Sequence, residues 1–174
     1  QLSQVLINQR NNTFEEIFDT GLPTLYQSDV EFNDFNLDGN VDIAIGGFKD
    51  TLNFITTRST GLYLNQGDNS FKLHATFQPS SDASVESADF DMDGDADIIV
   101  AGNYEATRIY WNENGRFVAD EKNNLFGFLY GQLVLGDIDN DGDTDIILGG
   151  NGNAYKSTIY LNDGAGIFTE GYYG

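Results

Sequence analysis

The chain has 174 residues, a formal net charge of −20 and no cysteine. A chain of this length supports one well-packed core, and without cysteine it has no disulfide, thiolate zinc site or cysteine nucleophile. The acidic excess argues against nucleic acid and anionic membrane surfaces as partners, and no apolar run approaches the ~18 residues that a membrane span requires.

The first predicted element is a strand pair in residues 1–20, with an apolar strand at Val5–Asn8 and a second strand from Phe14. The same pattern of apolar or aromatic residues, Asn, a polar turn and Phe recurs three times, and the turn contains Gly in these later copies but not in the first. Such a pattern predicts a β-hairpin. The later copies are Leu62–Asn65 with Phe71, Ile109–Asn112 with Phe117, and Ile159–Asn162 with Phe168. We expect Tyr63, Tyr110, Trp111 and Tyr160 in the core between blades, and Asn65, Asn112 and Asn162 at the entries of the turns.

An acidic nonapeptide precedes each of these later hairpins, at residues 34–42, 89–97 and 137–145. Each nonapeptide leads into a short apolar strand that ends in glycine. Carboxylates at alternate positions repel one another unless a cation neutralises them. Oxygen ligands at positions 1, 3, 5 and 9, with Gly at position 6 for a sharp turn, suit Ca²⁺. The three copies hold 13 of the 28 acidic residues, so nearly half of the acidic charge lies in the predicted metal sites.

The nonapeptides recur with a period of about 50 residues, and each period contains four strand signals, which is typical of a propeller blade. We therefore predict an all-β fold of four-stranded antiparallel β-propeller blades, with about three blades plus a partial one. The predicted organisation is one repeat domain over 1–174: a partial blade end at 1–20 and repeats at 21–74, 75–121 and 122–174. The longer first repeat has a polar insertion from Phe48 to Thr60.

The acidic loop, the apolar strand with glycine and the Tyr-x-Asn hairpin together resemble the FG-GAP and VCBS repeat family. These repeats build the integrin α-chain β-propeller and occur in many bacterial and fungal surface proteins. The resemblance implies three Ca²⁺ sites, one in a hairpin loop of each blade, and a role in adhesion and recognition. By position, the implied side-chain ligands are Asp34, Asn36, Asp38 and Asp42; Asp89, Asp91, Asp93 and Asp97; and Asp137, Asp139, Asp141 and Asp145. The seventh-position residues, which the resemblance implies as backbone carbonyl donors, are Asn40, Asp95 and Asp143.

The EF-hand shares the opening of this motif, but it requires a bidentate Glu at position 12 and flanking helices. Position 12 is Ile45, Val100 or Leu148 here, in a strand pattern, so the sequence does not predict an EF-hand. The first loop has Asn at positions 3 and 7 and carries fewer charges than the others. We expect it to bind Ca²⁺ most weakly.

Residues 1–20 repeat the part of a blade that is also present at 157–174, so both ends offer the same strands. We expect the chain to be part of a larger propeller or assembly. The predicted function is an extracellular or cell-surface binding and adhesion module that recognises protein or glycan. The alternatives are a structural repeat subunit of a surface assembly or fibre, bound to copies of itself, and a non-catalytic part of a secreted carbohydrate-active enzyme.

Catalysis by this chain itself is not predicted. Its one histidine, His74, lies in an alternating strand pattern and is expected to be a surface or packing residue. The sequence contains no cysteine and no Gly-x-Ser-x-Gly motif, so it does not support a catalytic triad. Metal binding already accounts for the carboxylate pairs that glycoside hydrolysis would require.

Overall fold

The computed structural model describes residues 4–50, 56–103, 106–151 and 155–171, which form strands and turns. Within these ranges no helix is long and apolar enough to cross a membrane. The strands are β1 (Val5–Asn8), β2 (Phe14–Ile17), β3 (Tyr26–Asn33), β4 (Asp42–Asp50), β5 (Thr56–Asn65), β6 (Phe71–Thr76), β7 (Ser81–Ala88), β8 (Asp97–Asn103), β9 (Arg108–Glu113), β10 (Arg116–Ala119), β11 (Leu129–Gly136), β12 (Asp145–Asn151), β13 (Tyr155–Leu161) and β14 (Thr169–Gly171).

The strands form one two-stranded sheet, β1–β2, and three four-stranded antiparallel sheets in which neighbours in sequence are neighbours in the sheet. The four-stranded sheets are β3–β6, β7–β10 and β11–β14, which we call sheets 1, 2 and 3. This arrangement confirms the predicted all-β fold with three blade-like sheets and a partial one. The repeat boundary predicted at residue 74 falls within β6.

In the predicted insertion from Phe48 to Thr60, residues 48–50 and 56–60 lie in strands β4 and β5, and residues 51–55 lie outside the described ranges. Phe48 pairs with Arg58 and Asp50 pairs with Thr56, so the polar residues lengthen the ladder between β4 and β5. On the β5 side this segment contains Thr56, Thr57 and Thr60, and β-branched residues of this kind favour strands. The sequence alone did not separate such a ladder from a loop.

Strand register repeats from sheet to sheet. The isoleucine that follows each acidic loop pairs with the tyrosine of the third strand in each four-stranded sheet. The pairs are Ile43 with Tyr63, Ile98 with Tyr110, and Ile146 with Tyr160. Each first strand also has a register shift near its start, in β3, β7 and β11 alike. The repeats seen in the sequence are therefore structural repeats at the level of single residue pairs.

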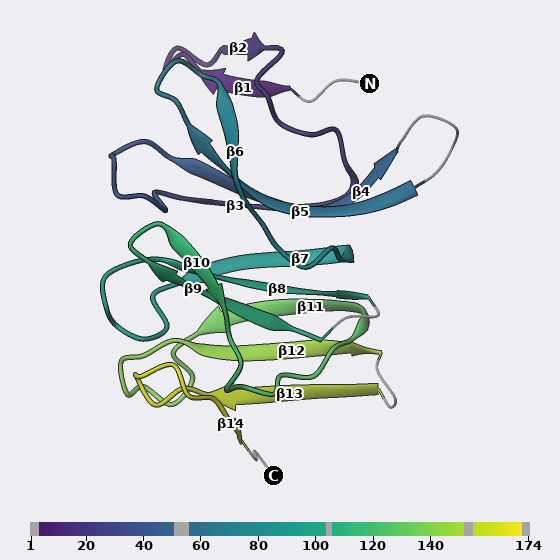
Figure 1. Cartoon of the computed structure of the whole chain (residues 1–174), viewed down its shortest axis with the longest axis vertical. Helices are drawn as coiled ribbons and strands as arrows, with labels where there is room; N and C mark the ends of the chain where they lie inside the picture. The colour runs from purple at the N-terminus through teal and green to yellow at the C-terminus, as the bar shows by residue number, and fades with distance from the viewer. Residues whose placement is uncertain (1–3, 51–55, 104–105, 152–154, 172–174) are drawn as a thin grey trace.

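The three sheets are stacked in chain order, with the β1–β2 hairpin beside sheet 1 (Figure 1). One apolar cluster lies between sheets 1 and 2 and another lies between sheets 2 and 3. Tyr110 belongs to the first cluster and Tyr160 to the second, so these two tyrosines are core residues between blades, as predicted. Burying one large apolar side chain stabilises a fold by about 1.5–3 kcal/mol, so these clusters supply the main attraction between sheets.

Polar contacts also join sheets 1 and 2. The hydroxyl of Tyr110 accepts a hydrogen bond of 2.8 Å from the backbone amide of Gln78, in the connection between the two sheets. His74 lies on the surface, and its Nε2 is 2.7 Å from the carbonyl oxygen of Gly115 in the next hairpin turn. A carbonyl only accepts, so Nε2 is the donor. The surface position predicted for His74 is confirmed, and its ring joins two sheets.

Candidate metal centres in the acidic loops

The three acidic loops connect the first and second strands of their sheets, between β3 and β4, β7 and β8, and β11 and β12. In every loop the fourth and sixth residues have left-handed backbone conformations. Glycine adopts this conformation without strain and is the sixth residue each time. The fourth residues are Leu37, Met92 and Asn140, with φ of 56°, 59° and 63°, and the sixth are Gly39, Gly94 and Gly142.

The first aspartate of each loop binds backbone amides within its own loop. Asp89 accepts hydrogen bonds of 3.0 and 2.9 Å from the amides of Asp93 and Gly94, one on each carboxylate oxygen. Asp34 and Asp137 make the same pair of bonds in their loops. The first aspartate therefore fixes the turn, and its oxygens face the centre of the loop.

The ninth aspartate is buried and ties its loop to the third strand of the same sheet. Asp97 Oδ2 accepts from the Phe90 amide at 3.0 Å, and Oδ1 accepts from the Asn112 amide at 2.8 Å. Asp42 and Asp145 bond to the equivalent amides. Burial raises the pKa of Asp97 to about 7, against the opposing effect of its two backbone bonds. These residues, predicted as ligands, thus have a second task in the fold.

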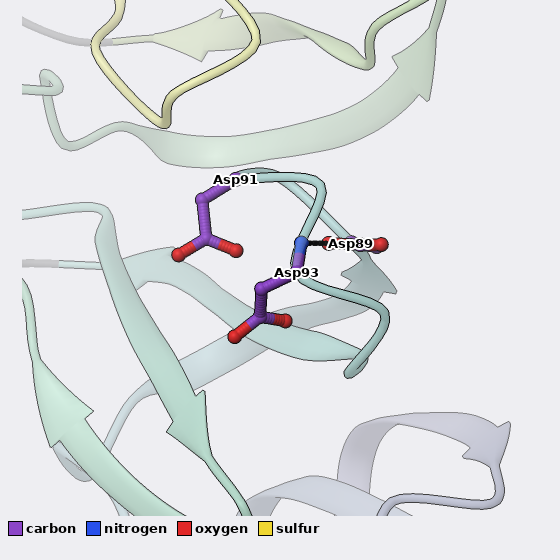
Figure 2. Close-up of side chains that lie close together, drawn as sticks. All are labelled: Asp89, Asp91 and Asp93. Carbon is purple, nitrogen blue, oxygen red and sulfur yellow. Dashed lines mark hydrogen bonds between the residues drawn. The ribbon is translucent and has the colours of Figure 1, made fainter.

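In the second loop, oxygens of Asp89, Asp91 and Asp93 all lie within 4.8 Å of one another. Figure 2 shows the carboxylates of Asp91 and Asp93 side by side, with the amide of Asp93 bonded to Asp89. Oδ1 of Asp91 is buried and accepts no hydrogen bond from any residue that the structure describes. Desolvation and then the charge of Asp93 raise the pKa of Asp91. A buried carboxylate oxygen with no partner is costly, and a cation would relieve that cost.

The third loop has a comparable cluster, in which oxygens of Asp137, Asp139 and Asp145 lie within 4.8 Å of one another. Asp143 is only 7% exposed, and its Oδ1 has no hydrogen-bond partner within the described ranges. Desolvation, followed by the charges of Asp141 and Asp145, raises the pKa of Asp143 to about 6. The side chain at position 7, assigned only a backbone role in the sequence analysis, therefore adds to the negative potential of this loop.

The first loop satisfies its carboxylates with amides instead. Nδ2 of Asn36 donates to one oxygen of Asp38 at 3.0 Å, and Nδ2 of Asn40 donates to the other at 2.9 Å. Hydrogen bonds from the backbone of Asn40 and the side chain of Asn36 hold the pKa of Asp38 below its usual value. Among the described residues, the groups of three carboxylates that could hold an ion occur only in the second and third loops.

All fifteen predicted site residues lie in their three loops, and two of the three loops bring carboxylates together into clusters that can hold a metal ion. The donors are carboxylate oxygens, hard ligands of the kind that bind Ca²⁺ or Mg²⁺. The unpartnered oxygens of Asp91 and Asp143 fit a cation at these loops. The oxygens of Asp42 and Asp97 are outside the two clusters and bond to backbone amides.

One set of residues was only partly recognised from the sequence. Asn112 was expected to bond its own turn, and its Oδ1 does accept from the Gly115 amide at 2.7 Å. Its Nδ2, however, donates at 2.9 Å to the carbonyl of Phe35, in the acidic loop of the preceding sheet. Asn162 does the same to Phe90 at 2.8 Å. The recurrence of Asn at this place is the one sequence signal that could have indicated the contact.

The rings of these two phenylalanines, like their backbone carbonyls, contact the next sheet. Phe35 packs edge to face against Phe117 at 6.2 Å between centroids, and Phe90 packs the same way against Phe168 at 5.6 Å. The second residue of each of these loops is therefore held at the border between two sheets, and the loop geometry depends on the next repeat as well as on its own.

In a comparison with known protein families, residues 89–148 match the model of the FG-GAP-like repeat. No curated protein matches the chain. The matched segment begins at the first aspartate of the second loop and ends in β12, so it includes both carboxylate clusters. Residues 89–148 of this chain are thus similar to the FG-GAP-like repeat.

Proposed function

We propose that the chain is a Ca²⁺-stabilised extracellular binding module that recognises a protein or glycan ligand. The observation that supports this most is the pair of carboxylate clusters in equivalent loops. Each of these loops also has one buried carboxylate oxygen without a partner among the described residues, on Asp91 in the second loop and on Asp143 in the third. FG-GAP-like repeats often bind Ca²⁺, which agrees with the hard-oxygen donor set.

In the second loop Asp89, Asp91 and Asp93 would hold the ion, and in the third loop Asp137, Asp139 and Asp145 would do so. A bound Ca²⁺ would supply positive charge that offsets the repulsion among these carboxylates. The chain's own residues prepare the loops for it: the first aspartate fixes the turn, and the ninth joins the loop to the third strand. The ion in this proposal is a structural support of the blade.

Recognition suits the chain better than catalysis. The only histidine bonds a backbone carbonyl, and the clustered carboxylates are accounted for by metal binding. With a net charge of −20, the surface favours ligands other than polyanions. Such a module presents loops to its ligand while the sheets stay fixed.

The proposal is tested first with Ca²⁺ alone and then with candidate ligands. Calorimetric titration of the metal-free protein with CaCl₂ should show binding that Asp91→Asn weakens. An array of glycans and immobilised extracellular-matrix proteins should then capture the protein in Ca²⁺ and release it in EDTA. Capture that is equal with and without Ca²⁺ would contradict a Ca²⁺-dependent module, and absence of Ca²⁺ binding would contradict the metal sites themselves.

A second candidate is a structural repeat subunit of an extracellular assembly. It is favoured by apolar residues left exposed on both outer sheets, Val30 and Phe32 on sheet 1 and Val134 on sheet 3. Exposed apolar sheet faces favour association. Light scattering over a range of protein concentrations separates the two candidates: a constant monomer mass favours recognition, and a mass that grows with concentration favours assembly.

A further inference from the structure

A groove of about 600 Å³ lies between the β1–β2 hairpin and sheet 1. Its lining is mostly apolar and includes Val5 and Ile7 from β1 and Val30 and Phe32 from β3. Val30 and Phe32 are 42% and 58% exposed, so apolar surface of sheet 1 faces the groove without cover. Burying such surface is favourable, and the structure itself shows what covers the same surface elsewhere.

Residues equivalent to Val30 are covered by the preceding sheet. Val30, Val85 and Leu133 each lie four residues before an acidic loop. Val85 and Leu133 are 1% and 3% exposed, against 42% for Val30. Strand β7, which holds Val85, packs against β3 and β4, and β11, which holds Leu133, packs against β7 and β8. The first two strands of a preceding sheet are thus what buries this position.

Asn65 lines the same groove and gives a second sign of the missing cover. Its equivalents Asn112 and Asn162 each donate an Nδ2 hydrogen bond to the second residue of the preceding acidic loop, Phe35 or Phe90. Like its two equivalents, Asn65 donates an Nδ2 hydrogen bond to a backbone carbonyl of its own acidic loop, that of Val41. Unlike them, it has no carbonyl from a preceding loop as a second acceptor among the described residues.

Phe71 gives a third sign, because it also lines the groove. It is equivalent to Phe117 and Phe168, which receive the rings of Phe35 and Phe90 edge to face. The groove therefore contains the positions that, in sheets 2 and 3, receive an aromatic ring and its backbone carbonyl from the preceding acidic loop.

The β1–β2 hairpin already supplies the other half of a preceding sheet. Asn8 and Phe14 stand where Asn65 and Phe71 stand in sheet 1, and Oδ1 of Asn8 accepts from the Arg10 amide at 2.8 Å, as Oδ1 of Asn65 accepts from its turn. β1 and β2 thus correspond to the third and fourth strands of a blade. The groove lies where its first and second strands belong.

We propose that this groove binds a β-hairpin whose two strands are joined by an acidic loop with an aromatic second residue. The ring packs on Phe71, the carbonyl of that residue accepts from Nδ2 of Asn65, and the strands cover Val30. The interfaces between sheets 1 and 2 and between sheets 2 and 3 are the template for this contact. A second whole copy of the chain is a poor occupant. If it docked through its sheet 3, its strands β13 and β14 would need the place that β1 and β2 of the first copy already occupy.

The test uses the full chain and a fluorescein-labelled peptide with the sequence of residues 81–103, which contains β7, the second acidic loop and β8. In Ca²⁺ buffer, anisotropy should show saturable binding of one peptide per chain, with a shift of the Asn65 side-chain amide in ¹⁵N spectra. Phe90→Ala in the peptide and Val30→Asp in the chain should each weaken binding by about tenfold or more, because one removes the ring and the other places a charge in the apolar groove.

Val134→Asp is the matched control, since Val134 is similarly exposed on the far sheet and should leave peptide binding unchanged. Thermal melting of both variants checks that the chain remains folded. Absence of binding, or equal binding to Val30→Asp and Val134→Asp chains, would overturn the proposal. Self-association of the chain that Val30→Asp abolishes and the peptide does not inhibit would also overturn it, in favour of a second copy.

Discussion

The side-chain amide of Asn112 donates a 2.9 Å hydrogen bond to the carbonyl oxygen of Phe35, which lies 77 residues earlier in the chain. Both residues are buried, and the bond joins the hairpin of sheet 2 to the acidic loop of sheet 1. Oδ1 of Asn112 also accepts a hydrogen bond from the backbone amide of Gly115 in the turn. One side chain therefore joins a turn, its own sheet and the neighbouring loop. The loops are thus part of the contacts between sheets.

Replacing Asn112 should therefore destabilise the fold more than replacing its equivalent in sheet 1. Asn112→Ala leaves the buried carbonyl of Phe35 without a partner and removes the bond to Ala96, so we expect a loss of about 2–3 kcal/mol in the free energy of unfolding. Asn65→Ala lacks the contact between sheets and should cost less. Urea unfolding measures both, and equal losses would contradict the role given to the Asn112–Phe35 bond.

Removing Ca²⁺ should lower the melting temperature, and the second loop should account for more of this loss than the first. A site in about hundredfold excess of ligand over Kd stabilises by about 2.7 kcal/mol. Asp34→Ala and Asp89→Ala remove equivalent bonds to backbone amides, so each serves as the control for the other. The stabilisation by Ca²⁺ should fall more in Asp89→Ala. A reversed ranking in calorimetric melts would contradict the weaker first site.

The metal-free protein should lose stability as the pH rises through the titration of Asp143. Burial and the charges of Asp141 and Asp145 raise the pKa of this carboxyl to about 6. Between about pH 4 and 6 the folded state keeps a proton that the unfolded chain has released, so the free energy of unfolding falls with rising pH. Asp143→Asn keeps the backbone carbonyl and removes the charge.

In EDTA at neutral pH, Asp143→Asn should melt at a higher temperature than the unsubstituted chain, and the two should converge toward pH 4, which is about the ordinary pKa of aspartate. Melting curves across this pH range measure the difference. A variant that stays less stable than the unsubstituted chain throughout would show that the Asp143 carboxylate is not a source of repulsion in the loop.

Leu37 occupies a left-handed backbone position that suits asparagine better. Its φ is 56°, and its side chain is 65% exposed, whereas the third loop has Asn140 at the same place. The left-handed conformation costs an ordinary residue about 1 kcal/mol, and asparagine tolerates it through local hydrogen bonds. Leu37→Asn should therefore raise the free energy of unfolding by up to about 1 kcal/mol. Val41→Asn, at an exposed position without positive φ, should give no gain in the same urea titration.

Much of the fold could be predicted from the sequence because the strands and loops are determined by patterns of residues close together in the chain. Each acidic loop is nine consecutive residues, and each hairpin is a short run around Asn and Phe, so strand order and sheet number followed from spacing. The structure confirms the three sheets and the partial one. The grouping of Asp89, Asp91 and Asp93 also follows from their alternate spacing within one turn.

What the sequence could not reveal depends on residues far apart. Phe35 looks like one more apolar residue in its loop, and only the stacked sheets show that its ring reaches Phe117 and its carbonyl reaches Asn112. Likewise the pKa of Asp38 lies below its usual value because the backbone amide of Asn40 and the side-chain amide of Asn36 donate to its carboxylate. Rotamer choices of this kind follow from the folded loop and are not fixed by spacing.

The ninth aspartate of each loop has a consequence for how such repeats can diverge. Asp42, Asp97 and Asp145 each bond two backbone amides that no ion replaces. Under the proposed metal binding, a descendant repeat without a cation could exchange the carboxylates at positions 3 and 5, yet it would still require an acceptor at position 9. In a repeat whose sequence has diverged and whose metal site has been lost, we expect the aspartate at position 9 to be the last acidic residue retained. Its presence would then identify the segment as a former metal-binding blade.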